Sequence, residues 1–184
     1  MRNTKFIKYN KKIHVLCGLL CLLTVIIDQA VKLAVLNNLT LHTSYKILPF
    51  LNFFLTFNSG VSFSMLNSCN SSVLILISCL CLLLLIWGYV KFKDPIEQIF
   101  LALLIGGATG NFIDRFTYGA VVDFIDVYMP KNILQNLHRY IKIFSEQTIF
   151  CDKHFPTFNI ADSFITIGTA GLILYIFFKK DTPK

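Results

Sequence analysis

The stretch SVLILISCLCLLLLIWGYV, residues 72–90, contains no Asp, Glu, Lys or Arg and is long enough to cross a lipid bilayer as one helix. Three more apolar segments of comparable length lie at residues 13–36, 96–113 and 159–178. Over the whole chain 55% of the residues are hydrophobic and only 15% are charged, whereas a soluble domain has about 25% charged residues. The sequence therefore predicts an all-α membrane protein whose four transmembrane helices belong to one domain, residues 1–184.

Basic residues flank the apolar segments and predict which helix ends face the cytoplasm. More than half of the 17 Lys and Arg residues lie before the first segment, between the second and third, or after the fourth: Arg2, Lys5, Lys8, Lys11, Lys12, Lys91, Lys93, Lys179, Lys180 and Lys184. Because basic residues collect on the cytoplasmic side, both termini are predicted to lie there, with loops 37–71 and 114–158 outside. This arrangement explains the net charge of +7 without a nucleic-acid partner.

The first outer loop contains a segment with strand character. Tyr45–Phe63 is rich in Phe, Leu, Ile and Thr, and Asn58-Ser59-Gly60 has the composition of a turn. We expect a small strand-and-turn unit at the membrane surface, where contact with lipid is the simple explanation for the Phe residues. Two of the six cysteines, Cys69 and Cys151, lie in polar loops, and the sequence leaves a disulfide between them open.

Half of the ten acidic residues lie within or beside apolar sequence: Asp28, Asp114, Asp123, Asp126 and Asp162. A carboxylate near the bilayer is costly and usually marks a functional path or site. With the predicted topology, Asp28 lies in the outer part of the first helix, Asp114 ends the third, and Asp162 opens the fourth. Asp123 lies in the outer loop just before that fourth helix. The motifs are therefore expected to reach the same outer level of the membrane.

Each of these polar groups also has a structural explanation. Asp28 and Lys32 are four residues apart and can form a neutral pair on one helix face. Asn111, Asp114 and Arg115 can simply end a helix, and Asn159 with Asp162 can cap one. Gly106 and Gly110 form a GxxxG pattern, which favours close helix packing.

Asp123 and Asp162 suggest a carboxylate pair that activates water. Two close carboxylates resist simultaneous ionisation, so they can share one proton and act as base and acid in peptide hydrolysis. Such a reaction requires no metal and no cofactor. Asp126, three residues past Asp123, competes for the role. A small proton- or ion-coupled transporter and an assembly factor are the alternatives, although a transporter needs polar groups at the midplane.

The motifs resemble lipoprotein signal peptidase, also called signal peptidase II, in order and over nearly the whole chain. The matching stretches are DQAVK at 28–32, FNSGVSF at 57–63, GGATGNFIDR at 106–115, GAVVDFID at 119–126 and FNIADSFITIG at 158–168. The resemblance implies four helices with a small extracytoplasmic β-rich cradle. It also implies an aspartic endopeptidase of the bacterial inner membrane that cuts diacylglyceryl-modified prolipoproteins just before the lipidated cysteine. Its partners would be these precursors and membrane lipids. Apart from the resemblance, we expect a monomer.

The resemblance also implies roles for individual residues. Asp123 and Asp162 match the catalytic aspartates, and the positions with supporting or substrate-contacting roles are Asp28, Lys32, Asn58, Gly60, Asn111, Asp114, Arg115, Asn159 and Ala161. The chain departs from the family in the spacing of Asp123 and Asp162, which is about twice the usual one. The excess lies at 131–153, where an amphipathic helix on the outer membrane surface is expected.

Overall fold

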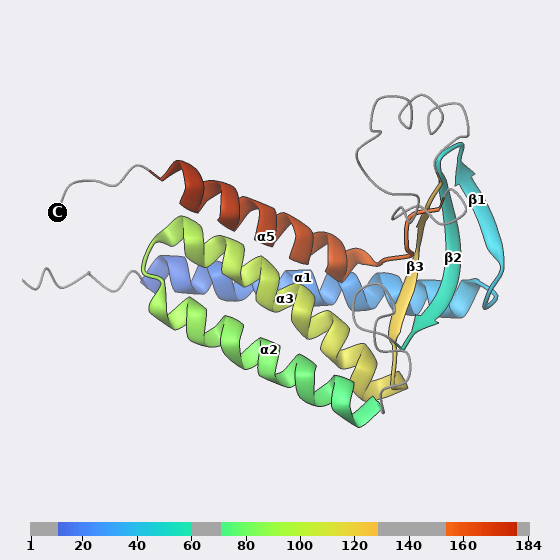
Figure 1. The fold of residues 1–184 in the computed structure, drawn as a ribbon, viewed down its shortest axis with the longest axis horizontal. Helices are drawn as coiled ribbons and strands as arrows, with labels where there is room; N and C mark the ends of the chain where they lie inside the picture. Colours follow the sequence, from blue (N-terminus) through green and yellow to red (C-terminus); the bar gives the residue numbers. More distant parts are fainter. Residues whose placement is uncertain (1–10, 60–70, 129–153, 180–184) are drawn as a thin grey trace, which may run out of the picture. The chain divides into compact units, whose positions relative to one another are not determined.

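The computed structural model describes residues 11–59, 71–128 and 154–179 of the chain. In chain order the elements are α1 (Lys11–Asn38), β1 (Ser44–Leu48), β2 (Leu51–Asn58), α2 (Ser71–Lys91), α3 (Pro95–Tyr118), β3 (Val121–Val127) and α5 (Ile160–Phe178) (Figure 1). All four helices are long and apolar enough to cross a membrane, which confirms the predicted architecture. The expected helix at 131–153, Gly60, Cys69 and Cys151 lie outside the described residues.

The helix α3 is longer than predicted. It continues past Ile113 to Tyr118, so Asp114 and Arg115, which were expected to end the helix, lie within its last turns. The helix ends at Gly119, which has a φ of 74° and whose N–H donates to the carbonyl of Arg115 at 3.0 Å. Glycine adopts this left-handed conformation without a steric penalty, and a helix commonly stops there. The sequence analysis ended the helix where the apolar residues end, at Ile113. The helix itself continues until Gly119 stops it.

The chain divides into two compact units, which we describe one at a time. The helical unit comprises Met1–Gln29, Ile75–Ile113 and Ile160–Lys184, and the sheet unit comprises Ala30–Leu74 and Asp114–Asn159. The single-domain organisation expected from the sequence stays a prediction.

In the helical unit, glycines let the neighbours of α3 approach closely. A Cβ built on Gly106 would come within 2.8 Å of Thr24 on α1, and one on Gly110 would collide with the Asp28 carboxylate. On another side of α3, a Cβ on Gly107 would lie 2.6 Å from the Ala161 carbonyl of α5. In the most apolar stretch of α3, 50% of the residues are buried, against 11% in the corresponding stretch of α2. The helix α3 is therefore the central one. The GxxxG interpretation as a packing motif is confirmed.

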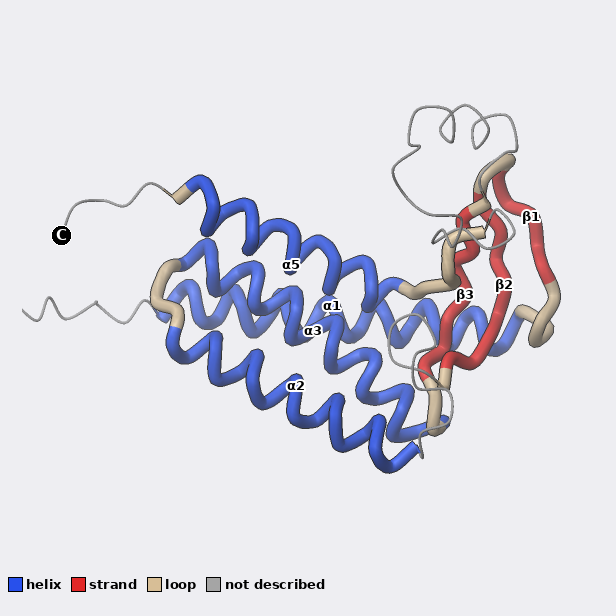
Figure 2. The backbone as a smooth tube through the Cα atoms, viewed as in Figure 1, coloured by secondary structure: helices blue, strands red, loops and turns tan. Residues whose placement is uncertain are grey.

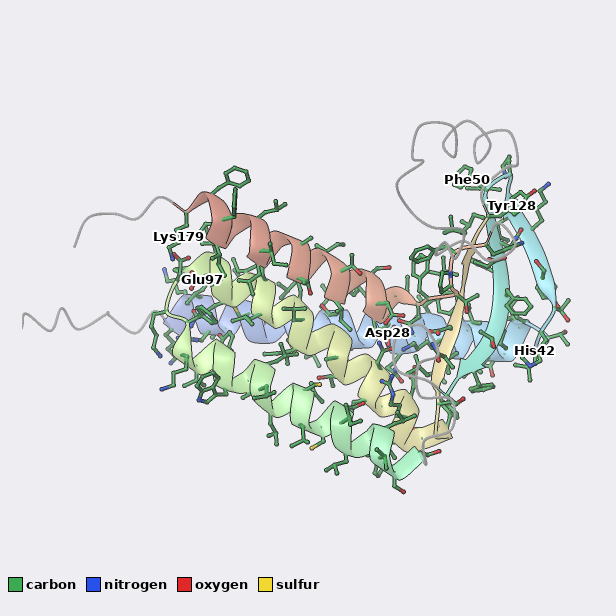
Figure 3. All side chains as sticks on the ribbon, viewed as in Figure 1. Asp28, His42, Phe50, Glu97, Tyr128 and Lys179 are labelled. Atoms are coloured by element: carbon green, nitrogen blue, oxygen red, sulfur yellow. The ribbon has the colours of Figure 1, made fainter. Side chains whose placement is uncertain are left out.

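A charged cluster joins α5 to the start of α3, at the end of α5 remote from Asp162. Lys179 Nζ lies 2.9 Å from Asp94 and 2.8 Å from Glu97, and the Tyr175 hydroxyl donates to Asp94 at 2.9 Å. Figure 3 shows Lys179 and Glu97 at the same end of the helices. Hydrogen bonds to Glu97 and Asp94 raise the pKa of Lys179. Burial alone would raise the pKa of Asp94, but its bonds from Lys179, the Ile96 N–H and Tyr175 lower it overall.

These shifts predict a pH range over which the cluster stabilises the fold. The Asp94 contribution is present above the ordinary carboxyl value of 3.8 and is lost as the pH falls through the lowered folded value. The contribution of Lys179 to stability is present below its ordinary pKa of 10.5 and is lost as the pH rises through the raised pKa of the folded protein. We expect Lys179→Gln to lower the melting temperature in detergent at pH 7 and to have a smaller effect near pH 3. The exposed Lys12→Gln is the control. An equal effect of Lys179→Gln at both pH values would contradict the assignment.

The sheet unit contains a three-stranded antiparallel sheet in the order β1-β2-β3 (Figure 2). The turn between β1 and β2 is formed by Pro49 and Phe50, since Leu48 pairs with Leu51. Asn58 is the last residue of β2 and pairs with Val121, and the turn expected at Asn58-Ser59-Gly60 continues into residues outside the described part of the chain. Pro49 suits a turn because its φ is already fixed. The cradle implied by the family resemblance is confirmed as a sheet.

The strand β3 was not predicted from the sequence pattern. Asp123 is the third residue of this strand and lies opposite Thr56, within the region that was expected to be an outer loop. Residues 121–124 are all buried. A strand that is buried on both faces lacks the alternation of polar and apolar residues by which a strand is usually recognised.

Candidate active site

Asp28 caps the helix α5 from α1. Its Oδ1 accepts the backbone N–H of Ala161, the second residue of α5, at 2.8 Å. A capping side chain just before the helix normally takes one of these first N–H groups. The positive end of the helix dipole also favours a carboxylate there. Asp28 is fully buried, and Gln29 Nε2 donates both to its Oδ2 and to the Gly110 carbonyl at 3.2 Å. Asp28 thus fixes the start of the helix that carries Asp162.

Asp162 lies in the first turn of α5 and is only partly buried. Asn111 Nδ2 on α3 donates to its Oδ1 at 2.7 Å. Asn111 itself is buried. The helical unit therefore brings together the motifs of α1, α3 and α5 that the sequence singled out, and it holds the Asp162 carboxylate with a neutral amide.

Asp123 is held from both sides by amides in the sheet unit. Asn58 Nδ2 donates to Oδ2 at 2.9 Å, and Asn159 Nδ2 donates to Oδ1 at 2.8 Å. The side chain of Asn159 also reaches the Val122 carbonyl at 3.3 Å. Asp123 is 1% exposed and Asn159 is fully buried. Asn159 therefore uses its amide N–H groups on β3, beyond the helix-capping role that the sequence left open.

Lys32 forms a buried ion pair with Asp114. Its Nζ lies 2.6 Å from Asp114 Oδ2, and the two side chains are 2% and 1% exposed. The same carboxylate oxygen accepts the Val122 N–H at 3.1 Å, which ties the beginning of β3 to α3. The sequence had suggested a different partner for Lys32, namely Asp28 on the same helix, and that pairing stays a prediction. Asp114 belongs to another helix, so the spacing of residues along α1 could not indicate it. A buried pair of this kind is costly to break by removing one partner.

Asp126 is separated from Asp123 by the geometry of β3. Residues three apart on a strand point to opposite faces, so Asp126 does not share the face on which Asp123 meets Asn58 and Asn159. Its Oδ2 accepts Asn52 Nδ2 at 2.9 Å, and its Oδ1 lies 2.7 Å from His154 Nδ1. Asp126 therefore has a different surrounding from its competitor for the catalytic role.

Three residues that support these carboxylates were not predicted from the sequence. Gln29, Asn52 and His154 were not singled out, although each donates to or pairs with an aspartate in the structure. Gln29 carried a signal, since it is a polar residue inside an apolar run and next to Asp28. Asn52 and His154 carried none, because their partner becomes visible only when the strands are paired.

The four helices that can cross a membrane, together with the buried carboxylates, define a multi-pass membrane protein with polar groups in its interior. A family model described as signal peptidase (SPase) II matches residues 20–178. The lipoprotein signal peptidase of Bartonella henselae is 35% identical over 155 residues, 83% of each chain. That of Acinetobacter baumannii is 35% identical over 174 residues, 90% of this chain and 85% of its own.

Two solved bacterial membrane enzymes have the same fold. One has a TM-score of 0.71 at 30% identity and covers 91% of both chains. The other has a TM-score of 0.67 at 32% identity and covers 90% of this chain and 94% of its own. The chain belongs to the signal peptidase II family, and it is an aspartic peptidase.

The close approach of α1 and α3 at Asp28 can be tested by adding a methyl group at Gly110. Gly110→Ala places a methyl group against the Asp28 carboxylate, and overpacking of this kind costs about 1–3 kcal/mol. We expect lower thermal stability and lower peptidase activity in the same detergent preparation. Gly18→Ala is the matched control, since a Cβ there meets nothing within 4 Å. It should be neutral or stabilising by up to about 1 kcal/mol. Equal behaviour of the two variants would contradict the packing described for Gly110.

Proposed function

We propose that this chain removes the signal peptide from diacylglyceryl-modified prolipoproteins, with Asp123 and Asp162 as the pair that activates water. The observation that carries the proposal is the set of donors around these two carboxylates. Asn58 and Asn159 donate to Asp123, and Asn111 donates to Asp162. A donating amide orients a carboxylate and favours its ionised form, but it does not add the charge of a neighbouring cation. A carboxylate that must exchange a proton is well served by amides.

The chain path supports the same pairing. Asn159, which binds Asp123, is three positions before Asp162, and Asp28 binds the N–H of Ala161 between them. One short segment thus contacts Asp123 and also carries the other aspartate. Support for the proposal also comes from the family's motif positions, on which Asp123 and Asp162 fall.

The proposed mechanism needs only the two carboxyl groups and water. They hold one proton between them, because like charges at close range resist simultaneous ionisation. The ionised carboxylate takes a proton from water as the water oxygen attacks the scissile carbonyl carbon. The protonated partner donates a hydrogen bond to the developing oxyanion and then gives its proton to the leaving nitrogen. Asn58, Asn159 and Asn111 keep the carboxylates oriented throughout. The transporter alternative is not supported, because the family to which the chain belongs consists of peptidases.

The catalytic pair predicts the kinetics of three variants. Asp123→Asn and Asp162→Asn keep the shape of the side chain and one accepting oxygen but cannot exchange the proton. Each variant should therefore still bind a diacylglyceryl-modified precursor but not cleave it. The double variant should be little worse than either single one, because residues that act as one unit are not additive. Cleavage by purified protein in detergent is the measurement. Wild-type rates in both single variants would refute the assignment.

Asp126→Asn is the control for these variants. It changes a carboxylate on the other face of β3, and an amide oxygen can still accept a hydrogen bond from His154. It should therefore retain measurable turnover. An inactive Asp126→Asn together with a fully active Asp123→Asn would exchange the roles of the two residues.

We further propose that the protein lies in the inner membrane with both termini in the cytoplasm and acts there as a monomer among membrane lipids. The distribution of Lys and Arg supports this orientation. It places the loops 37–71 and 114–158 outside, where a signal peptide leaves the membrane. Reporter fusions should read cytoplasmic after residue 93 and extracytoplasmic near residue 55. A cytoplasmic reading at residue 55 would reverse the topology and remove the proposed site from the outer surface.

A further inference from the structure

A short segment returns along β3 just before α5. The backbone of Tyr128 bridges His154, and that of Ile125 bridges Phe158, both in antiparallel sense. The Phe155 N–H donates to the Val127 carbonyl at 2.9 Å, and the Phe158 N–H donates to the Ile125 carbonyl at 3.1 Å. We call residues 154–159 the return segment. It ends at Asn159, whose amide holds Asp123.

The backbone pairing of the return segment is not in continuous register. Between the two bridges the return segment advances by four residues from His154 to Phe158. The facing chain moves back by only three, from Tyr128 just after β3 to Ile125, so the return segment has one residue more. Pro156 lies in this bulge and has no N–H to donate. The return segment is joined to β3 by isolated bridges and not by a continuous ladder, and a slip by one residue would turn each side chain to the other face. Side-chain contacts at its two ends add to the backbone bonds that set this register.

Those two contacts are made to two aspartates of β3. At one end His154 Nδ1 lies 2.7 Å from Asp126 Oδ1, where the carboxylate accepts and the imidazole donates. At the other end Asn159 donates to Asp123. Asp126 is buried and is held on its second oxygen by Asn52 of β2, so it is a fixed anchor. His154 is 45% exposed and also contacts the Tyr128 ring, with centroids 5.2 Å apart.

We propose that His154 is a positioning residue, which acts through Asp126 to hold the return segment in the register that places Asn159 on Asp123 and Asp162 at the start of α5. The inference rests on the proposed catalytic roles of these two aspartates. It explains why a buried carboxylate on the non-catalytic face of β3 is paired with a residue next to α5. It also fits the long chain between Asp123 and Asp162, because a longer connection constrains its ends less.

The test compares three variants in the full-length protein. His154→Ala removes the donor, whereas His154→Asn keeps an N–H close to the position of Nδ1. His42→Asn is the matched control, since His42 is exposed, lies before β1 and has a φ of 59°, a conformation that Asn tolerates. Two quantities are measured: hydrogen exchange of the peptide that contains Phe155 and Phe158, and kcat and KM for a diacylglyceryl-modified precursor.

We expect faster exchange of that peptide in His154→Ala, and a fall in kcat of about three- to tenfold, the range of one ordinary hydrogen bond, with KM nearly unchanged. His154→Asn should restore most of both, and His42→Asn should match the wild type. Unchanged exchange in His154→Ala would overturn the register role. Faster exchange with wild-type kcat would overturn the link to the site. If the wild type itself does not cleave the precursor, the proposed function fails, while the exchange result still decides whether His154 fixes the segment.

Discussion

The cost of burying carboxylates is the constraint on which this structure depends. Asp28, Asp114, Asp123 and Asp126 are each almost completely buried, and a buried carboxylate without partners would be strongly destabilising. Each of them has donors from another segment of the chain. Asp28 accepts the Ala161 N–H and Asp114 pairs with Lys32. Asp123 accepts from two asparagines, and Asp126 from Asn52 and His154. These bonds connect the elements of each unit to one another. The polar groups thus organise the fold as well as the site.

The carboxylates differ in the kind of donor that binds them, and this difference matches the roles proposed for them. Asp114 and Asp126 have a lysine and a histidine as partners, and their bonds tie β3 to α3 and the return segment to β3. Asp28 takes a backbone N–H and caps a helix. Asp123 and Asp162 are oriented by asparagine amides. In the proposed mechanism, proton transfer falls to the two carboxylates that are held by amides, and the others position them.

The sequence predicted the four helices because uninterrupted apolar length is a strong signal that does not depend on tertiary contacts. It also singled out the aspartates that prove to be buried, because a carboxylate in apolar sequence is rare, while their catalytic roles stay a prediction. It did not predict the end of α3, which depends on Gly119, or the strand β3, whose buried faces hide the alternation of a strand. The ion pair of Lys32 with Asp114 and that of Asp126 with His154 join residues of different elements, so spacing along one helix or loop could not identify them.

The proposed mechanism requires that Asp123 and Asp162 share one proton. Infrared difference spectroscopy can detect that proton in protein with isotope-labelled aspartate carboxyl groups, at a pH where the enzyme is active. We expect one protonated-carboxyl band that disappears in Asp123→Asn and equally in Asp162→Asn, and that persists in Asp126→Asn. A band that survives in either of the first two variants, or that is lost only in Asp126→Asn, would contradict the shared proton.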